Sequence, residues 1–448
     1  MSAIALHSAS SPTRAEHWHF DYPQAKIRDS VTITLPVAVE TKEDELDIPP
    51  NGGLKAWLQV LGSWMLFFNT WGILNTFGVY QTYYESGVLF KTTSSNIAWI
   101  GSIQALAMLA TGAFAGPLYD RGYFRWLLIV GSLGVVLGHM LLSLVATYWE
   151  AILTQGFLVG IGGGCLYVPA VAILPTYFTS NVGLALGIAA SGSSTGGIIY
   201  PIMFYKLIDK VGFAWSVRIL GFTALATLII PFAVMKVRAK PAKARSAIDW
   251  TAFSDGKFMT AVAGVMMGFT SCYVTVFYTS YFGTASGIVD TSLAFYLVPI
   301  LNAGSMFGRT LPNWLSDTIG PLNVIMPSAM IVGALLFCNT AVVSAGGIVT
   351  TTLLLGFFEG VFLALPPAVF VTLIEDKSKI GTRIGMGLAL AGLGVFPAGL
   401  GGGALLGSHV DQHFRNLWIF GGAFAICAGA IFTALRVWKG GFGLFVKV

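Results

Sequence analysis

Charged residues are scarce in this sequence. Only 10% of its 448 residues are Asp, Glu, Lys or Arg, whereas soluble domains carry about 25%. Hydrophobic residues make up 55%. Apolar runs of about 20 residues, the length of helix that crosses a hydrocarbon core of roughly 30 Å, recur along the chain. The composition therefore excludes a soluble globular protein and predicts a membrane protein.

Patterns that mark other classes of protein are also missing. Alternating ten-residue strands, the sign of an outer-membrane barrel, do not occur, so we expect an all-α membrane protein. The four cysteines lie in apolar runs without paired spacing and are expected to be small core residues rather than a disulfide framework or a metal site: Cys165, Cys272, Cys338 and Cys427. There is no nucleotide-binding loop, and no nucleophile, base and orienting residue are grouped, so we expect neither an enzyme nor a cofactor.

The first 53 residues contain no apolar run. They are rich in acids, Ser, Thr and Pro, which is typical of a disordered tail, and they lack the short apolar core of a cleavable signal peptide. Insertion into the membrane is therefore expected to begin with the first membrane helix.

Beyond this tail, the apolar runs predict twelve membrane helices. They are expected at 56–80, 97–118, 124–147, 150–174, 184–205, 214–236, 258–283, 291–314, 321–343, 346–374, 384–407 and 415–437. The strongly polar run around 237–257 divides them into equal sets. The expected organisation is an N-terminal tail (1–53), a six-helix bundle (54–236), a linker (237–257), a second six-helix bundle (258–437) and a C-terminal tail (438–448).

The positions of lysine and arginine predict the orientation. With the tail and the linker on one side, fifteen cations flank the helix ends of that side and four flank the other, so both termini are expected in the cytoplasm. The basic linker taken alone could bind nucleic acid, but topology accounts for its charge and we expect no nucleic-acid partner. Trp250 and Phe253 at its end are expected to anchor it on the membrane surface.

A repeat relates the two predicted bundles. A shift of 198 positions places Tyr80 on Tyr278, Gly162 on Gly360 and Pro169 on Pro367, and a shift of 197 places Asp120 on Asp317. The matched residues fall in corresponding helices, as in carriers built from parallel repeats, whose substrate lies between the halves near the bilayer midplane while the halves rock around it.

A charged turn follows the second predicted helix, with the sequence Gly116-Pro-Leu-Tyr-Asp-Arg-Gly-Tyr-Phe-Arg125. Asp120 there can cap a helix or pair with Arg121 or Arg125. The turn resembles the loop signature of the major facilitator superfamily, G-x-L-x-D-R-x-G-x-R, and Asp317 lies in its echo in the second half. The resemblance implies a gate latch formed by Asp120, Arg121, Arg125 and Asp317, away from the substrate.

A second signature runs from Tyr177-Phe178 to the glycine-rich stretch Gly183–Gly197, and small residues at Gly183/Gly187 and Gly192/Gly196 are expected to let helices pack closely. Together with Leu301-Asn302-Ala-Gly304 and Gly308-Arg309, it resembles fungal members of the monocarboxylate carrier family. The animal lactate carriers also use a lysine in the first span and an aspartate four residues before the arginine. Here the first span contains no lysine after Lys55 at its start, and the position of the aspartate is Ser305. Proton-coupled lactate uptake is therefore not expected to carry over.

Ionisable residues within a bilayer are costly and commonly functional. Arg309 shares a helical face with Asn302 and Ser305 and could hold an anionic substrate, or it could pair with a helix end or a distant acid. Glu359 could be its partner, a proton carrier, or a satisfied polar contact between helices. Arg218 and His139 are expected to be structural.

The first span adds a second candidate set. Asn69, Thr76 and Tyr80 lie on one helical face, and Tyr278 is the repeat's counterpart. Aromatic rings with polar tips suit a cavity that binds a partly apolar molecule, although tyrosine is also common at the membrane interface.

These features predict a gradient-driven secondary transporter of the plasma membrane, which moves a small organic acid or a secondary metabolite by alternating access, with protons as a possible coupling ion. Two alternatives are open. One is an efflux pump for a fungal metabolite or toxin, and the other is a nutrient receptor that does not transport, although the short tail argues against a receptor.

Overall fold

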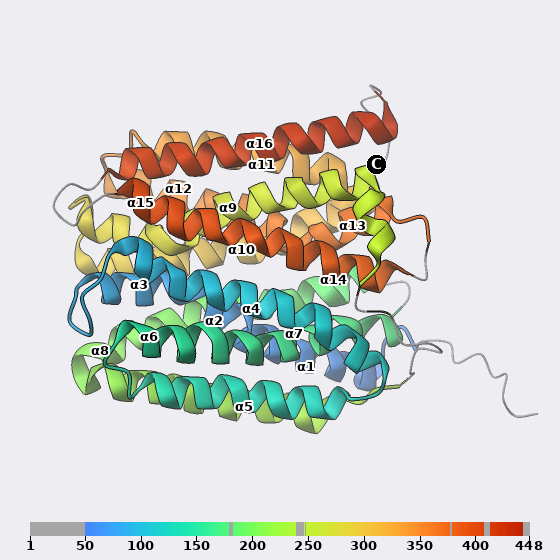
Figure 1. Ribbon diagram of the computed structural model, residues 1–448, viewed down its shortest axis with the longest axis horizontal. Coiled ribbons are helices and arrows are strands. Elements are labelled where there is room, and N and C mark those ends of the chain that lie inside the picture. Colours follow the sequence, from blue (N-terminus) through green and yellow to red (C-terminus); the bar gives the residue numbers. More distant parts are fainter. Residues whose placement is uncertain are drawn as a thin grey trace, which may run out of the picture. The chain divides into compact units, whose positions relative to one another are not determined.

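The computed structural model describes residues 50–178, 182–238, 246, 248–376, 379–406 and 413–441. Three predictions fall outside these residues: the tail up to residue 49, the linker cations Lys240, Lys243 and Arg245, and the C-terminal tail beyond residue 441. All regular secondary structure in the described part is helical, as Figure 1 shows. The expected all-α fold is confirmed.

The chain forms its helices in two sets. The first comprises α1 (Gly53–Asn69), α2 (Trp71–Asn75), α3 (Phe77–Glu85), α4 (Ser94–Asp120), α5 (Phe124–Leu142), α6 (Tyr148–Ala151), η1 (Ile152–Val159), α7 (Gly160–Ala172), η2 (Leu174–Thr176) and α8 (Val182–Val234). The second comprises η3 (Trp250–Ser254), α9 (Gly256–Ala285), α10 (Thr291–Ile319), α11 (Pro321–Asn339), α12 (Ala345–Ala364), α13 (Pro366–Leu373), α14 (Ile380–Ala391), η5 (Gly392–Gly394), η6 (Pro397–Gly401), α15 (Gly402–Leu406) and α16 (Phe414–Gly440).

Ten stretches of the described chain are single helical runs long and apolar enough to cross a membrane, and two local features bring this number to the predicted twelve. The run α8 contains two spans, because Gly212 interrupts it with a φ of 72°, a conformation that glycine adopts without strain. The first span is divided into α1, α2 and α3. The hydroxyls of Thr70 and Thr76 bond back to the carbonyls of Leu66 and Gly72 at 2.9 Å, a contact that bends helices.

Side-chain caps determine where several helices start. Thr93 accepts a hydrogen bond from the Asn96 backbone N–H at 3.3 Å at the start of α4. Asp255 and Ser344 each accept a backbone N–H at 3.1 Å, at the starts of α9 and α12. These oxygens satisfy N–H groups that the first turn leaves free, so the short polar connections define the helix boundaries.

The helices before the linker and those after it form two adjoining bundles, blue to green and yellow to red in Figure 1. Within the bundles, α1 packs along α8, α10 along α12, and α11 along α16. Between the bundles, α8 packs on α10, α3 on α9, and α4 on α14 and η6. A site between the halves is therefore lined mainly by these helices.

Glycine determines how closely α10 and α12 approach. A Cβ atom at Gly308 would overlap the Phe357 carbonyl oxygen, and one at Gly360 would lie 2.8 Å from the Ser305 carbonyl oxygen. Gly192 and Gly196 likewise face the carbonyls of Trp64 and Phe68 on the first span, as expected. The expectation was wrong for Gly187, because a Cβ atom there meets nothing within 4 Å.

Part of the linker is attached to the first turn of α14. Arg383 donates to Asp249 at 2.9 Å and to Asp255 at 2.7 Å, and the Lys379 Nζ lies 3.4 Å from Asp249. The Thr251 hydroxyl also donates to Asp249, at 2.6 Å. Burial would raise the pKa of Asp249, but these hydrogen bonds outweigh it and hold the pKa well below the ordinary value. We call this group of ion pairs the linker clamp.

The exposure of the predicted surface anchors and of the four cysteines can now be compared with the predictions. Trp250 and Phe253 are both exposed on η3, at 74% and 46%, as the proposed surface anchors would be. The prediction that all four cysteines are core residues was wrong for Cys338 and Cys427, which are exposed, whereas Cys165 and Cys272 are buried. An apolar run does not separate the two cases, because helix faces that contact lipid are as apolar as the core.

Candidate functional site

A polar cluster lies in the middle of the long helices where the two halves meet. Asn302, Ser305 and Arg309 of α10 line a cavity of about 10 Å³ together with Asn75 of α2 and Glu359 of α12. The spacing of the three α10 residues predicted a shared face, and the structure brings them together. It also adds an acid from the same half and an amide from the other half. We call these five residues the central cluster.

Arg309 is almost fully buried, with 3% of its surface exposed. Its Nε donates to the Ser305 hydroxyl at 3.0 Å, and its Nη1 donates to the hydroxyl of Ser193 on α8. Its Nη2 has no hydrogen-bond partner among the described residues. Neither a helix end nor an acid therefore takes up this guanidinium within the described part of the chain.

Glu359 occupies the other wall of the same small cavity and is also 3% exposed. Thr275 lies beside its carboxyl group, and Oε1 has no hydrogen-bond partner among the residues that the structure describes. No ion pair joins it to Arg309 within this region. A basic group and an acidic group, each with one atom that lacks a hydrogen-bond partner among the described residues, thus line the same cavity.

The close crossing of α10 and α12 explains why these two side chains meet. Gly308 precedes Arg309 and Gly360 follows Glu359, and a Cβ atom at Gly360 would lie 3.2 Å from the Arg309 backbone nitrogen. Backbones that approach this closely bring the flanking side chains to the same level of the bundle. The sequence marked both glycines but gave no sign that they face each other.

Asn75 and Asn302 connect the two halves. The Asn75 amide donates to the Asn302 carbonyl oxygen at 3.0 Å, and the Asn302 amide donates to the Val298 carbonyl at 3.0 Å. Gly197 of α8 leaves room for this contact, since a Cβ atom there would overlap the Asn302 side chain. The central cluster is therefore a bridge between the halves in this conformation.

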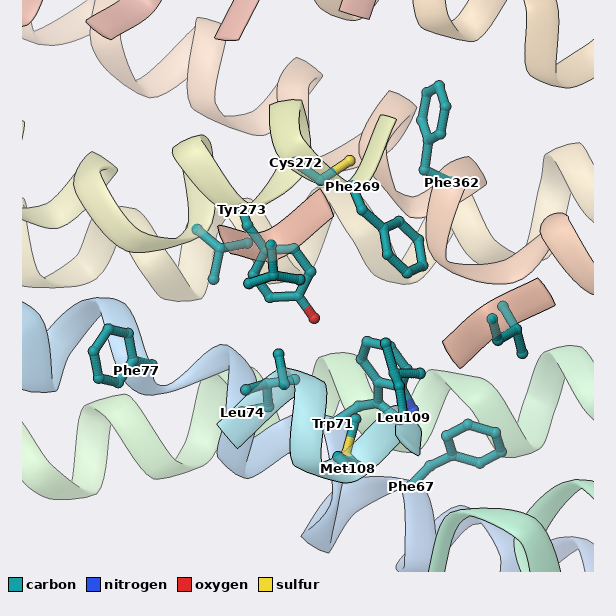
Figure 2. Packing of buried hydrophobic residues seen from close by; sticks show 14 of the residues in the cluster. Phe67, Trp71, Leu74, Phe77, Met108, Leu109, Phe269, Cys272, Tyr273 and Phe362 are labelled. Carbon is teal, nitrogen blue, oxygen red and sulfur yellow. The ribbon is translucent and has the colours of Figure 1, made fainter. Parts of the chain in front are cut away.

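Aromatic residues surround the cluster. The hydroxyl of Tyr273 is buried without a partner among the described residues, and Figure 2 shows it directed from α9 toward the first half, where Trp71 and Leu74 lie. Tyr167 of α7 packs edge to face with Phe67 and Trp71 at ring distances of 6.0 and 5.8 Å. Both tyrosines are close enough to Arg309 to interact with it electrostatically.

A larger cavity of about 350 Å³ lies between the halves, on the linker side of the central cluster. Its walls come from α4 and α7 of the first half, from α13 and α14 of the second, and from Ser246 of the linker. The Thr382 hydroxyl donates to the Ser246 carbonyl at 2.8 Å. The linker thus forms part of the wall at that end.

On the opposite side the halves are in contact. The Ser95 hydroxyl donates to the Leu400 carbonyl at 3.3 Å, and a Cβ atom at Gly403 would lie 2.5 Å from the Ser95 Cα. Glu85, buried at the end of α3, accepts hydrogen bonds from Gln81 and Ser94 at 2.9 Å. The described conformation is therefore closed at this end.

The first-span candidates lie elsewhere. Asn69 bonds to Thr227 and Tyr200 of α8 at 2.9 and 2.7 Å, and Tyr80 packs on Phe204 of α8 with rings 4.6 Å apart. The shared face therefore points into the first bundle. Thr76 bonds to its own helix, and the Tyr278 hydroxyl donates to the Gly399 carbonyl at 2.9 Å.

The gate candidates lie at the linker ends of the helices. A Cβ atom at Gly183 would lie 3.1 Å from the Asp317 Oδ2, so this carboxylate sits against the first turn of α8 in the other half, where a helix favours negative charge. Asp120 is buried at the end of α4, and Arg121 is exposed. Arg125 donates to the carbonyls of Phe232 and Met235 at 2.6 and 3.1 Å.

Sequence reasoning missed several residues of this region. Ser193 lies in the glycine-rich stretch Gly183–Gly197, which the sequence indicates as a packing surface. Asn75 directly precedes the candidate site residue Thr76. Tyr167 and Tyr273 carry no motif. A search for polar residues near the middle of each predicted span would have found Ser193, because such residues are rare at that depth. Asn75 lies near the end of the predicted first span, so the same search would have missed it.

Comparison with known proteins agrees with this architecture. Residues 56–374 match the model of the Major Facilitator Superfamily. The chain is 56% identical over 381 residues to the MFS-type transporter dbaD of Emericella nidulans, which covers 85% of this chain and 86% of that protein. It is 34% identical over 392 residues to the Aspyridones efflux protein apdF of the same fungus, which covers 87% of this chain and 79% of that protein.

A solved structure has the same fold at low sequence identity. The nucleoside transporter NupG superposes with a TM-score of 0.67 and 13% identity, over 84% of this chain and 99% of that chain. The twelve spans in two bundles, the family match and the fungal relatives agree with one another. The chain therefore belongs to the Major Facilitator Superfamily and is a membrane transporter.

Proposed function

We propose that this transporter is a gradient-driven carrier that exports a small organic acid or an acidic metabolite by alternating access. The observation that carries the proposal is Arg309, a buried guanidinium between the halves whose Nη2 has no hydrogen-bond partner among the described residues. A buried charge without a counter-charge is costly, and a guanidinium pairs well with a carboxylate or another oxygen anion. A bound anion would satisfy it, bridging the halves at the level where they meet.

The other members of the central cluster have supporting roles in this proposal. Asn302, Ser305 and Asn75 orient the anion, and we assign proton coupling to Glu359, because its carboxyl group lines the same cavity as Arg309. Asn69, Tyr80 and Tyr278 hold the helices around the site, since Asn69 and Tyr278 bond to neighbouring helices and the Tyr80 ring packs on Phe204. Thr76 bonds to its own helix and shapes the first span.

Alternating access requires that each end of the site closes in turn. The large cavity lies between the halves on the linker side, while the halves are in contact at the other end. We assign Asp317 and its repeat partner Asp120, with Arg121 and Arg125, to the latch that closes the linker side. The repeat supports bundle limits of 54–236 and 258–437, joined by the linker.

Sequence features and a relative's name support the proposed direction of transport and the proposed branch. The excess of cations on the linker side supports cytoplasmic termini, and the relative named as an efflux protein supports export, across the plasma membrane. The motifs around Gly183–Gly197 and Gly308-Arg309 support a place in the monocarboxylate-carrier-like branch. Because the relatives are named as transporters, we assign the chain no catalytic activity.

The proposal can be tested with purified protein in liposomes and radiolabelled benzoate as the probe. Counterflow exchange should require Arg309, so Arg309→Gln should reduce it to the level of empty liposomes. The matched control is Arg218→Gln, because Arg218 bonds to Ser143 at 2.9 Å far from the central cluster. Exchange that survives Arg309→Gln would overturn the anion site.

A second measurement separates binding from coupling. An imposed pH gradient should drive accumulation of benzoate, and Glu359→Gln should abolish that accumulation while counterflow continues. A protein that binds benzoate without moving it would instead be a receptor.

A further inference from the structure

The large cavity has an unusual lining for a path that delivers an acid. None of the described residues that line it is charged, and most of their side chains are aliphatic, among them Leu109, Val168, Val171, Ala172, Ile384 and Leu388. At about 350 Å³, its volume lies at the lower end of the roughly 300–1,000 Å³ found for pockets that hold small organic ligands.

Tyr167 relates this apolar cavity to Arg309. It lines the cavity, and it is near enough to Arg309 for the charge of the guanidinium to act on it. Phe67 and Trp71 hold its ring in place by edge-to-face contacts. The arrangement runs from an apolar chamber, past an aromatic residue, to one buried cation.

Tyr273 contributes a polar atom from the opposite half. Tyr273 is 2% exposed, and its buried hydroxyl has no partner among the described residues and is directed across the interface. Phe269 and Phe277 flank its ring at 6.2 and 5.4 Å. A buried hydroxyl without a partner costs free energy, which a ligand oxygen at this place would recover.

We propose that the substrate is a predominantly apolar weak acid. Its hydrophobic body, about the size of two fused rings, occupies the large cavity, and its single ionisable oxygen reaches Arg309 and the Tyr273 hydroxyl. The inference rests on the proposed function, since it takes Arg309 as the anion site. It narrows the substrate class from organic acids in general to apolar weak acids. It also assigns Tyr167 and Tyr273 to substrate recognition.

The same geometry disfavours other acids. A dianion or a zwitterion would place a second charge against walls whose described residues carry no charge, and a buried charge without a partner is costly. A short hydroxy acid would satisfy Arg309 but leave the apolar cavity unfilled. A neutral ring compound would fill the cavity but leave Arg309 without a counter-charge.

Three probes test these alternatives with the purified protein in detergent: 2-naphthoate, 2-naphthylmethanol and lactate. Heats of binding are measured by titration, and empty micelles correct for partition of the rings. We expect 2-naphthoate to bind about a hundredfold more tightly than lactate, because every ~55 Å² of additional buried apolar surface is worth about tenfold in affinity. We expect 2-naphthylmethanol, which lacks the charge, to bind at least about tenfold more weakly than 2-naphthoate.

Variants then locate the two ends of the ligand. Ala172→Leu fills the large cavity and should weaken 2-naphthoate by about tenfold or more, whereas the same substitution at the exposed Ala226 of α8 should leave its affinity unchanged. Tyr273→Phe removes one hydrogen bond and should weaken 2-naphthoate by about three- to tenfold. Thermal unfolding of each variant verifies that it is folded.

The outcomes separate this inference from the proposed function. Lactate binding as tightly as 2-naphthoate, with both lost in Arg309→Gln, would overturn the apolar substrate and leave the anion site intact. Equal affinity for 2-naphthoate and 2-naphthylmethanol, unaffected by Arg309→Gln, would overturn the anion site and the inference with it. Unchanged 2-naphthoate affinity in both Ala172→Leu and Tyr273→Phe would overturn the assignment of the cavity.

Discussion

Replacement of Gly308 by alanine should damage both the stability and the transport activity of this protein. A Cβ atom at this position would lie 2.7 Å from the Phe357 carbonyl carbon and closer still to its oxygen, whereas non-bonded heavy atoms normally lie roughly 3.5–4.0 Å apart. Helices α10 and α12 must therefore separate by about 1 Å. Overpacking of this kind costs about 1–3 kcal/mol.

The consequence for transport is larger than the loss of stability suggests. Arg309 follows Gly308 directly, so the displacement moves the guanidinium relative to Glu359 and Asn75. A misplacement of about 1 Å in a binding constellation can reduce a rate by as much as ~100-fold. We expect benzoate counterflow in liposomes to fall at least about tenfold.

Gly187→Ala is the matched control for this prediction. The new methyl group meets nothing within 4 Å, and alanine in a helix is favoured over glycine by roughly 0.5–1 kcal/mol. The control should therefore unfold at the same or a higher temperature than the unchanged protein and should transport normally. If Gly308→Ala matched it in both measurements, the close crossing would not be what holds Arg309 in place.

Two further predictions concern the linker side. Because hydrogen bonds hold the pKa of Asp249 below its ordinary value, the linker clamp stabilises the protein at every pH above that value and is lost only as the pH falls through the lowered pKa. Asp249→Asn should cost about 1–3 kcal/mol at pH 7 and speed amide hydrogen exchange in residues 248–255. Asp255→Asn should have a smaller effect on stability and on exchange, because the Asp255 carboxylate is more exposed. Equal exchange rates in the unchanged protein and both variants would contradict the linker clamp. Asp317→Asn should lower the maximal rate of counterflow more than the apparent affinity, because Asp317 acts at α8 and not at Arg309; an unchanged rate would argue against the latch.

Much of the fold was predictable because it depends on local properties of the chain. The length of each apolar run corresponds to a span, and the observed ends differ from the predicted ones by a few residues. The subdivision of the first span was not predicted, since it depends on whether Thr70 and Thr76 bond to their own backbone. Which cysteines are buried could not be predicted either, because helix faces that contact lipid are as apolar as faces in the protein core.

The site was predictable only where helical spacing sufficed. Positions 302, 305 and 309 share a face of any helix, so their grouping followed from the sequence. The contacts of Arg309 with Ser193 and of Asn302 with Asn75 join residues 116 and 227 positions apart, and no local pattern contains them. The face of Asn69 and Tyr80 was identified, but which neighbour it meets depends on how α8 packs.

The Asn75–Asn302 hydrogen bond lies near the middle of α10, a helix of 29 residues. At 1.5 Å per residue such a helix is about 44 Å long, so each lever arm measures roughly 20 Å. A tilt of about 10° around this point moves the helix ends by roughly 3–4 Å, whereas atoms within about 3 Å of the point move by only about 0.5 Å. This amide bridge can therefore act as a fulcrum that stays bonded while the ends of the halves open and close.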